Sequence, residues 1–190
     1  MSNPDFHPNA HLDFDVDTLV GMIPIRPVVF SIGSNLGDRL AYLQAAVDAL
    51  RFTPNLTLID VSPVYETDPV GMVLEQPQFL NLVVRADTTL ASLVLLERAQ
   101  AIENAYRRTR DVPGGPRTLD VDLIVVGERV KNTPVLTLPH PRAHERAFVL
   151  AQWLDIEPAA TVPERGPVAG LLAGLDRSGV RRRDDLTIDL

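Results

Sequence analysis

The chain reads Leu119-Asp120-Val121-Asp122-Leu123-Ile124-Val125-Val126 a little past its midpoint, and this stretch decides how the rest is interpreted. Aliphatic and β-branched residues dominate it, which is typical of a buried strand. Because alternate residues of a strand share a face, the odd-numbered residues are expected on one face and the even-numbered residues on the other. The strand therefore carries two carboxylates, Asp120 and Asp122, on a face that Ile124 and Val126 continue as apolar.

Strand and helix patterns ahead of this stretch complete a fold. Apolar runs rich in β-branched residues predict strands, and apolar residues at spacings of three and four predict helices. The patterns place strands at 28–32, 56–64, 79–86 and 119–126 and helices at 40–50 and 95–106. The order is β-α-β-β-α-β, the split βαβ arrangement of ferredoxin-like folds. We therefore expect an α+β fold, with an antiparallel sheet and both helices on one of its faces.

Local signals refine these elements. Polar side chains are candidate helix caps, Asn35 or Asp38 for the first helix and Thr88 or Thr89 for the second. Pro63 marks an edge or a bulge near the end of the second strand. C-terminal additions follow the core: residues 147–153 fit either a helix or a strand, and residues 167–175 fit a short helix.

Three parts of the chain differ in character. Residues 1–26 mix Asn, Pro, His and Asp with little periodicity, which indicates a flexible acidic N-terminal extension. Residues 27–176 are expected to form a single domain, because a chain of this length buries roughly 70 % of its surface on folding. Residues 177–190 contain the charge run 181–185 and are expected to be a solvated tail.

Composition excludes several classes of protein. The chain has 190 residues, 45 % of them hydrophobic, and no cysteine, which excludes a disulfide framework, thiolate catalysis and metal sites built on cysteine. Its net charge of −7 makes nucleic acid an unexpected partner. No apolar run approaches the roughly 20 residues of a membrane span, and the start of the chain is acidic rather than basic and apolar. We expect a cytoplasmic protein that does not bind membranes.

The acidic pair is the sharpest chemical feature. Two aspartates separated by one residue on a strand have Cα atoms about 6.5–7 Å apart. Their repulsion raises the pKa of one carboxyl unless a cation lies between them. Mg²⁺ takes such oxygen ligands and usually arrives with substrate phosphates. The alternative is an edge strand with one solvated face, and the apolar Ile124 and Val126 on the acidic face fit that poorly.

A basic loop precedes the pair. Lys131 is the only lysine, and arginines gather between Arg98 and Arg117. The loop 108–117 combines arginines with two prolines and two glycines. Arginines beside a metal-binding pair are the arrangement that phosphoryl transfer needs, and such a loop suits a lid that excludes water. The alternative is a surface loop whose arginines pair with Asp111 and its neighbours.

Two further stretches are weaker signals. Residues 31–38 join a strand to a helix N-terminus, where anions bind, but they lack the lysine of a nucleotide-binding P-loop. Residues 138–148 bring His140 and His144 close to Arg142 and Arg146. Prolines on both sides of His140 argue against a helical zinc site, so contact of His140 and Arg146 with phosphate is the better interpretation.

Five segments together resemble the 6-hydroxymethyl-7,8-dihydropterin pyrophosphokinase family of folate biosynthesis. They are residues 33–38 (GSNLGD), 64–69 (VYETDP), 76–81 (QPQFLN), 115–122 (GPRTLDVD) and 138–148. They occur in the family's order and span about 28–175. The resemblance implies a ferredoxin-like α+β fold and an enzyme that transfers pyrophosphate from ATP to the hydroxymethyl group of a reduced pterin, releasing AMP.

The resemblance also implies roles for single residues. Asp120 and Asp122 match the positions that hold two Mg²⁺ ions with ATP, and Arg108 and Arg117 match catalytic basic positions. The positions that match ATP contacts are Gln100, Glu103, Arg110, Leu123, Thr137, His140 and Arg146. The positions that match pterin contacts are Thr67, Val70, Phe79, Asn81 and Phe148. The family suggests a monomer, and neighbouring enzymes of the pathway are possible partners of the N-terminal extension.

The chain departs from the family pattern in the loop. Pro113 and Gly114 stand where the family usually has a basic residue and a tryptophan, and Pro141 stands where a tyrosine often follows the histidine. These changes remove an aromatic cover and phosphate contacts, which predicts a slower or more weakly binding enzyme. Two alternatives follow: a module that binds nucleotide and pterin with little turnover, and a different Mg²⁺-dependent phosphotransferase on the same fold.

Overall fold

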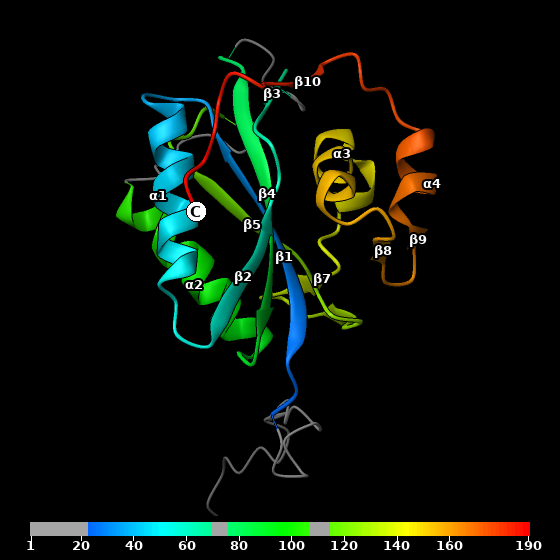
Figure 1. Ribbon diagram of the computed structural model, residues 1–190. Coiled ribbons are helices and arrows are strands. Elements are labelled where there is room, and N and C mark those ends of the chain that lie inside the picture. Colours follow the sequence, from blue (N-terminus) through cyan, green and yellow to red (C-terminus); the bar gives the residue numbers. More distant parts are fainter. Residues whose placement is uncertain (1–22, 70–75, 107–114) are drawn as a thin grey trace, which may run out of the picture.

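The computed structural model describes residues 23–69, 76–106 and 115–190. Strands and helices alternate along the core and are followed by short C-terminal elements (Figure 1). The core elements are β1 (Arg26–Ser34), α1 (Arg39–Arg51), β2 (Leu56–Val61), β3 (Tyr65–Thr67), β4 (Phe79–Thr88), α2 (Ser92–Ala105) and β5 (Asp120–Val126). The later elements are β6 (Lys131–Asn132), β7 (Thr137–Leu138), the 3₁₀ turn Ala143–Glu145, α3 (Ala147–Ile156), β8 (Thr161–Val162), β9 (Gly166–Pro167), α4 (Val168–Ala173) and β10 (Val180–Arg182).

The main sheet has six strands in the order β10-β3-β4-β1-β5, with β2 also paired to β4. Every pairing in it is antiparallel. The expected β-α-β-β-α-β core is confirmed, and its second strand is split into β2 and β3, which pair with opposite ends of β4. Residues 147–153, which the sequence left open, belong to helix α3.

The split in the second strand has a local cause. Pro63 has no backbone N–H to donate to a neighbouring strand. The Ser62 hydroxyl accepts from the Val83 backbone N–H at 2.9 Å, so a side chain takes the place of a strand contact at this point. The chain then rejoins β4 as β3, whose Thr67 pairs with Phe79 and whose Tyr65 pairs with Asn81. The split therefore brings Thr67 to the end of the sheet that carries the polar residues described below.

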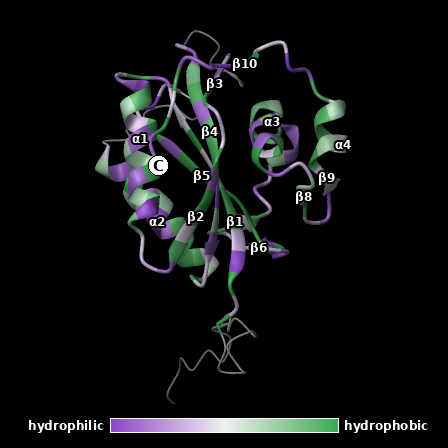
Figure 2. Ribbon diagram, in the orientation of Figure 1, coloured by the Kyte–Doolittle hydropathy of each residue, from purple (hydrophilic) through white to green (hydrophobic). Residues whose placement is uncertain are grey.

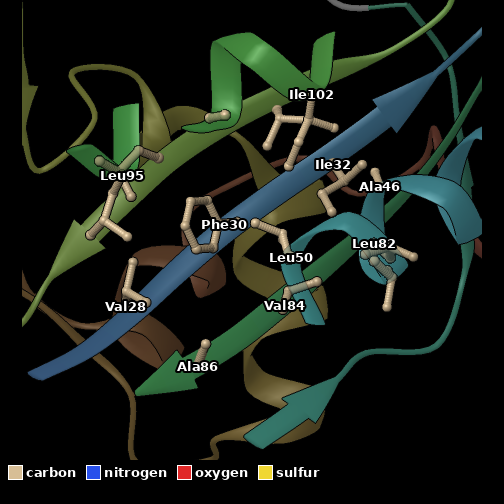
Figure 3. Packing of buried hydrophobic residues seen from close by; sticks show 14 of the residues in the cluster. Val28, Phe30, Ile32, Ala46, Leu50, Leu82, Val84, Ala86, Leu95 and Ile102 are labelled. Carbon is tan, nitrogen blue, oxygen red and sulfur yellow. The ribbon is translucent and has the colours of Figure 1, made fainter. Parts of the chain in front are cut away.

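Helices α1 and α2 cover one face of the sheet, as expected (Figure 1). Alternate residues of β1 and β4 meet the apolar sides of these helices, and Figure 3 shows this packing from close by. The residues labelled there are Val28, Phe30, Ile32, Ala46, Leu50, Leu82, Val84, Ala86, Leu95 and Ile102, and all are at least 97 % buried. Burying one such side chain contributes about 1.5–3 kcal/mol, so this cluster supplies much of the stability of the domain.

Helices α3 and α4 lie on the opposite face of the sheet (Figure 1). Trp153 and Leu150 of α3 pack there against Val29 and Val83, in a second apolar cluster. Figure 2 shows apolar residues along the strands and in helices on both sides of the sheet. Beyond this cluster the same face of β1 and β4 becomes polar, and that part of the face carries the site described below.

Strict alternation along β5 holds only as far as Ile124. Val29 of β1 pairs with Val125, but Phe30 pairs with Leu123, so Ile124 is an extra residue in the ladder. Such a bulge reverses the faces of the residues that follow it. Val125 therefore joins Ile124 in the cluster under α3, and Val126 lies in the cluster under α1 and α2. The expected faces of Val125 and Val126 are thus wrong, whereas Asp120 and Asp122 share a face as expected.

The two helix starts differ. Asp38 caps α1, because its Oδ1 accepts from the Ala41 backbone N–H at 3.1 Å. The expected cap of α2 is wrong: Ala91 occupies the cap position without a side-chain hydrogen bond. The Thr88 hydroxyl instead accepts from the Leu90 N–H at 3.0 Å, ahead of the helix.

Residues 177–190 are not simply the solvated tail that the charge run suggested. β10 pairs with β3 in the main sheet, and Leu186 and Ile188 pack against the core beneath α1 and α2. Each arginine of 181–183 has a carboxylate partner outside the segment: Asp68, Asp155 and Glu66 respectively. The charges therefore attach this segment to the fold.

The N-terminal extension falls mostly outside the described residues, since these begin at residue 23. Across the described ranges, none of the helices has the length and apolar character needed to cross a membrane.

Candidate active site

A polar pocket of about 250 Å³ lies on the second face of the sheet, beside the N-terminal end of α3. It is lined by Ser31, Gly33, Thr67, Asp68, Gln76, Phe79, Asn81, Arg117, Asp120, Asp122, Arg142, Arg146 and Phe148. Eight of these residues were predicted from the sequence as site residues. The lining residues come from β1, β3, β4 and β5, from α3 and from the segments that flank β3, β4, β5 and α3, so the fold brings together residues that are far apart in the chain.

The acidic pair faces two arginines. Asp120 and Asp122 point from β5 into the pocket, one on each side of Val121. An Arg117 Nη2 lies 2.9 Å from Asp120 Oδ2, and an Arg146 Nη1 lies 2.6 Å from Asp122 Oδ2. The four side chains are between 13 % and 25 % exposed, so each charge is largely withdrawn from water. The positive charges of the two arginines thereby offset the negative charges of both carboxylates.

Asp122 is held in its ionised form. Burial acts to raise the pKa of its carboxyl, but the charge of Arg146, that of His140 when it is protonated, and the hydrogen bond from Arg146 outweigh burial and lower it. Burial in turn lowers the pKa of His140, against the attraction of Asp122, with a further lowering by the charge of Arg146. The imidazole is therefore neutral at neutral pH, and the arginines are the cations that keep Asp122 ionised.

His140 has a defined orientation. Its Nδ1 accepts from the Arg142 backbone N–H at 3.2 Å, and its Nε2 lies 3.8 Å from Asp122 Oδ2. Because a neutral imidazole carries one N–H, the proton is assigned to Nε2, on the side of Asp122. His140 therefore presents a donor toward the acidic pair.

Two aromatic side chains line the other part of the pocket. Phe79 comes from β4 and Phe148 from the first turn of α3. The Arg117 guanidinium lies over the Phe79 ring, 5.3 Å from its centre, within the range of a cation–π contact. Arg117 thus connects the aromatic part of the pocket with the acidic part.

A fixed amide lies next to these rings. The Asn81 side chain donates to the Thr67 hydroxyl through a bond of 2.7 Å, and both residues are at least 96 % buried. Buried polar groups are costly unless they are bonded, so this pair is held in place. The pocket thereby offers aromatic faces with an immobile polar edge, which suits a flat heteroaromatic ligand.

Asn35 holds together segments that line the pocket, a role that the sequence did not predict: Asn35 was a candidate helix cap and part of the 33–38 segment, without an assigned contact. Its Oδ1 accepts from the Arg117 backbone N–H at 2.8 Å, and its Nδ2 donates to Gln76 at 3.0 Å and to the Pro77 carbonyl at 3.1 Å. One buried amide therefore joins the end of β1 to the segments before β4 and before β5. The signal that could have found it is an asparagine directly after a buried strand, within a segment that carries the resemblance.

Other pocket residues were also missing from the predicted set. Ser31 and Gly33 lie on β1, paired with Asp122 and Asp120 of β5; the sequence placed them only in a strand and in a turn that could bind an anion. Asp68 accepts from Gln78 and from Arg181 at 2.8 Å and 2.9 Å. Arg142 lies on the segment that the resemblance covered, but only its neighbours were assigned.

Several predicted residues lie away from the pocket. Glu103 is buried in α2 and accepts from the Val121 backbone N–H at 2.9 Å, next to the acidic pair but on the opposite face. Leu123 is buried in the core, Thr137 lies on β7, and Gln100 is exposed on α2. Their assignment to the nucleotide stays a prediction. Val70, Arg108 and Arg110, like Pro113 and Gly114 of the loop, lie outside the described residues.

The protein groups that could hold a metal at this site are few. Within 23–69, 76–106 and 115–190, no cluster of three or more histidine, aspartate or glutamate side chains has the geometry of a metal site. Asp120 and Asp122 line the pocket together and could supply one or two carboxylates to an ion that completes its shell with water and substrate oxygens. That preference belongs to Mg²⁺.

Comparison with known proteins places this chain in a family. The model of the family described as 7,8-dihydro-6-hydroxymethylpterin-pyrophosphokinase (HPPK) matches residues 29–158. A 2-amino-4-hydroxy-6-hydroxymethyldihydropteridine pyrophosphokinase of Pseudomonas aeruginosa is 41 % identical over 158 residues, which is 83 % of this chain and 97 % of the relative. An enzyme of the same name from Mycobacterium tuberculosis is 46 % identical over 170 residues, 81 % of this chain and 88 % of the relative.

Solved structures agree on the fold. A crystal structure of HPPK-DHPS in complex with substrates superimposes with a TM-score of 0.62 over 79 % of this chain, at 12 % identity. A wild-type Plasmodium falciparum HPPK-DHPS with pterin and p-hydroxybenzoate gives a TM-score of 0.61 at 14 % identity. This chain spans 43 % of each of those longer chains.

The fold, the pocket and the extent of the family match lead to one assignment. The match begins inside β1 and ends just after α3, so it contains both carboxylates, both paired arginines and both aromatic rings. The chain therefore belongs to the 7,8-dihydro-6-hydroxymethylpterin-pyrophosphokinase family, and it is an enzyme, a diphosphokinase of folate biosynthesis.

Proposed function

We propose that this enzyme transfers pyrophosphate from ATP to the hydroxymethyl group of 6-hydroxymethyl-7,8-dihydropterin, with Mg²⁺. The observation that carries the proposal is the joining of two half-sites in one pocket: aromatic rings with a fixed amide on one side, and two carboxylates with two arginines on the other. The first suits a pterin and the second suits a polyphosphate. The order of the strands sets the two half-sites side by side.

The pterin side is formed by Phe79, Phe148, Asn81 and Thr67. A pterin is flat and carries an amide-like edge, so it gains from aromatic surfaces and from donors and acceptors that are already fixed. The bond between Asn81 and Thr67 supplies such a fixed edge before any ligand arrives. We expect little rearrangement of these two side chains when the pterin binds.

Asp120 and Asp122 would hold the Mg²⁺ ions on the phosphate side. Their fit to the metal rests on two observations: both carboxylates face one pocket, and Asp122 is kept ionised despite its burial. When bound, Mg²⁺ withdraws negative charge from phosphate oxygens. Arg117 and Arg146, which pair with these carboxylates, line the same pocket and would donate to phosphate oxygens bound there.

In the proposed reaction the pterin hydroxyl oxygen attacks the β-phosphorus of ATP. A bond forms between this oxygen and the β-phosphorus, the bond from the β-phosphorus to the oxygen bridging it to the α-phosphorus breaks, and AMP leaves with that oxygen. The hydroxyl proton passes to solvent, and we assign no side chain as a general base. The chain's contribution is to align the two substrates and to offset charge on the transferred group through Arg117 and Arg146.

A product assay tests the proposal. The protein is incubated with ATP, Mg²⁺ and 6-hydroxymethyl-7,8-dihydropterin, and the adenine nucleotides are separated. AMP that appears only with the pterin is the expected result, and omission of Mg²⁺ should abolish it. ADP in its place would contradict the proposal and indicate a phosphotransferase that moves a single phosphoryl group. Binding of both ligands without product would indicate a binding module.

We also propose that the enzyme is a monomer in the cytoplasm and that neighbouring enzymes of folate biosynthesis are its partners. Support for a partner comes from the HPPK-DHPS chains, in which a matching fold is part of a longer chain. Light scattering of the purified protein tests the monomer: a mass of twice the chain would contradict it.

A further inference from the structure

Gly33 lies where the two half-sites meet. On β1 it pairs with Asn81 of β4 on one side and with Asp120 of β5 on the other. Neighbouring strands are about 4.8 Å apart, so Gly33 separates the proposed pterin side from the acidic pair by one strand. It also lines the pocket itself. A side chain at this position would therefore project into the lining of the pocket.

The backbone does not require glycine here. Gly37, in the turn that follows β1, has a φ of +67°, a conformation that other residues adopt only with strain. Gly33 is part of regular antiparallel β1, outside that left-handed region. Glycine at position 33 is therefore needed because a side chain would lack room, and not because of the backbone conformation.

That space is taken by Asn81. A Cβ at position 33 would lie 2.5 Å from Asn81 Oδ1, well inside van der Waals contact, and 3.7 Å from Phe79 Cδ1. Atoms of Asn81 and Phe79 are the three nearest to that Cβ, and both residues belong to the proposed pterin side. The Asn81 amide cannot give way freely, because it is 96 % buried and bonded to Thr67 at 2.7 Å.

We propose that Gly33 is a positioning residue for the pterin, acting through Asn81. Its missing side chain allows the Asn81 amide oxygen to lie next to Gly33 while the amide stays bonded to Thr67, and this fixes the polar edge that would bind the pterin. The inference rests on the proposed function, because it assigns Asn81 to the pterin. It adds that the residue on the neighbouring strand sets the orientation of this amide.

A double-mutant cycle tests the inference. Gly33→Ala, Asn81→Ala and the double variant are compared with the unaltered protein. The dissociation constant of 6-hydroxymethyl-7,8-dihydropterin is measured by calorimetry with Mg²⁺ and α,β-methylene-ATP, whose α–β linkage does not break. The affinity for α,β-methylene-ATP alone is measured separately. Gly170→Ala is the matched control, since a Cβ at Gly170 meets no atom within 4 Å.

Gly33→Ala is expected to weaken pterin binding by about tenfold or more, the order of effect of a misplaced contact group. In the Asn81→Ala background, Gly33→Ala should alter the dissociation constant of the pterin by less than about twofold, because the clashing amide is gone. Affinity for the nucleotide analogue should stay within about twofold throughout, so that KM for the pterin changes more than kcat. Equal weakening by Gly33→Ala in both backgrounds would overturn the inference.

Two further outcomes are informative. If Gly33→Ala fails to fold and the double variant folds, the clash with Asn81 is supported through stability instead of affinity. If neither variant folds, glycine at position 33 is required for the sheet to form whatever residue stands at position 81, and the inference is wrong. Failure of the proposed function is recognised separately, because the unaltered protein would then neither bind the pterin nor release AMP.

Discussion

At the scale of single residues, the pocket depends on charges that are compensated before a substrate arrives. Asp122 is buried enough for desolvation to oppose its ionisation, yet Arg146 at 2.6 Å keeps the pKa of its carboxyl below the ordinary value. Arg117 forms an ion pair with Asp120 at 2.9 Å while its guanidinium lies over the Phe79 ring. Removing one member of such a pair leaves the other as an uncompensated buried charge, so a substitution there affects the stability of the fold as well as the binding of substrates.

Asp122→Asn tests the role of the acidic pair. The change keeps the volume of the side chain and removes its charge, so we expect turnover to fall by at least about a hundredfold, as when a preorganised electrostatic group is lost. AMP release and the far-ultraviolet circular dichroism spectrum are measured together. Asp60→Asn is the control, because Asp60 pairs with Arg85 outside the pocket. Turnover within a few-fold of normal with an intact spectrum would refute a metal-binding role.

Tyr65 gives a prediction of pH dependence. Burial, followed by the 2.8 Å hydrogen bond to Asp155, raises the pKa of its phenol to about 12. A raised pKa in the folded state means that this contribution to stability is complete below about pH 10 and is lost as the pH rises toward 12. The difference in tyrosinate absorbance between the unaltered protein and Tyr65→Phe isolates this group.

Asp155→Asn should lower the midpoint of that difference titration, because it removes the neighbouring negative charge. Circular dichroism over the same pH range verifies that the chain is still folded. An unchanged midpoint would mean that burial alone sets the pKa of Tyr65.

At the scale of elements, the sequence predicted regular structure well and the exceptions poorly. The order and type of the core elements followed from apolar periodicity, which depends only on which side of an element is buried. The bulge at Ile124 and the division of the second strand into β2 and β3 depend on partners in other strands. The local sequence pattern does not show which residues of other strands will be those partners.

The site was predictable to a similar degree. Asp120 and Asp122 stand out because they share a face within an apolar strand, and the resemblance supplied most of the aromatic and basic residues. Gly33, Asn35 and Arg142 were missed as site residues because their roles come from what lies across the sheet or beside the pocket. Such roles require coordinates, since each residue type is common in turns and strands.

The start of α1 offers a prediction at this scale. The Asp38 side chain bonds to the Ala41 N–H at the helix start, and replacing such a cap with alanine costs about 1 kcal/mol. Asp38→Ala should therefore lower the melting temperature by about 2–4 °C. Asp38→Ser should lower it by much less, because a serine hydroxyl can also cap the helix. Thermal unfolding followed by circular dichroism measures both. Equal losses in the two variants would show that the cap is not the cause.

At the scale of the whole molecule, the C-terminal segment is part of the fold although the family match ends at residue 158. β10 extends the sheet beyond β3, the short strand that carries Thr67 into the pocket. The backbone of Asp68 donates to the Gly179 carbonyl at 3.0 Å, which adds a second connection near the pocket. The end of the chain thereby supports one wall of the proposed pterin site.

Ending the chain after Asp176 should therefore cost stability and pterin affinity together. Half-buried Leu186 and Ile188 alone account for about 1–2 kcal/mol, which corresponds to a fall of several degrees in melting temperature. Thermal unfolding and pterin titration measure the two effects. Removal of Leu190 alone is the control, since that side chain is 65 % exposed. Unchanged pterin affinity after the longer deletion would show that β3 holds its position without β10.

The course of the last residues has a practical consequence. Asp189 exchanges two hydrogen bonds with the Gln44 side chain of α1, at 2.9 Å each, so the chain terminates on the face of the sheet opposite the pocket (Figure 1). The first described residues lead into β1 at Arg26, the end of that strand far from Gly33. If the enzyme were attached to a solid support through Leu190, the pocket would consequently face away from the support, toward the substrate solution.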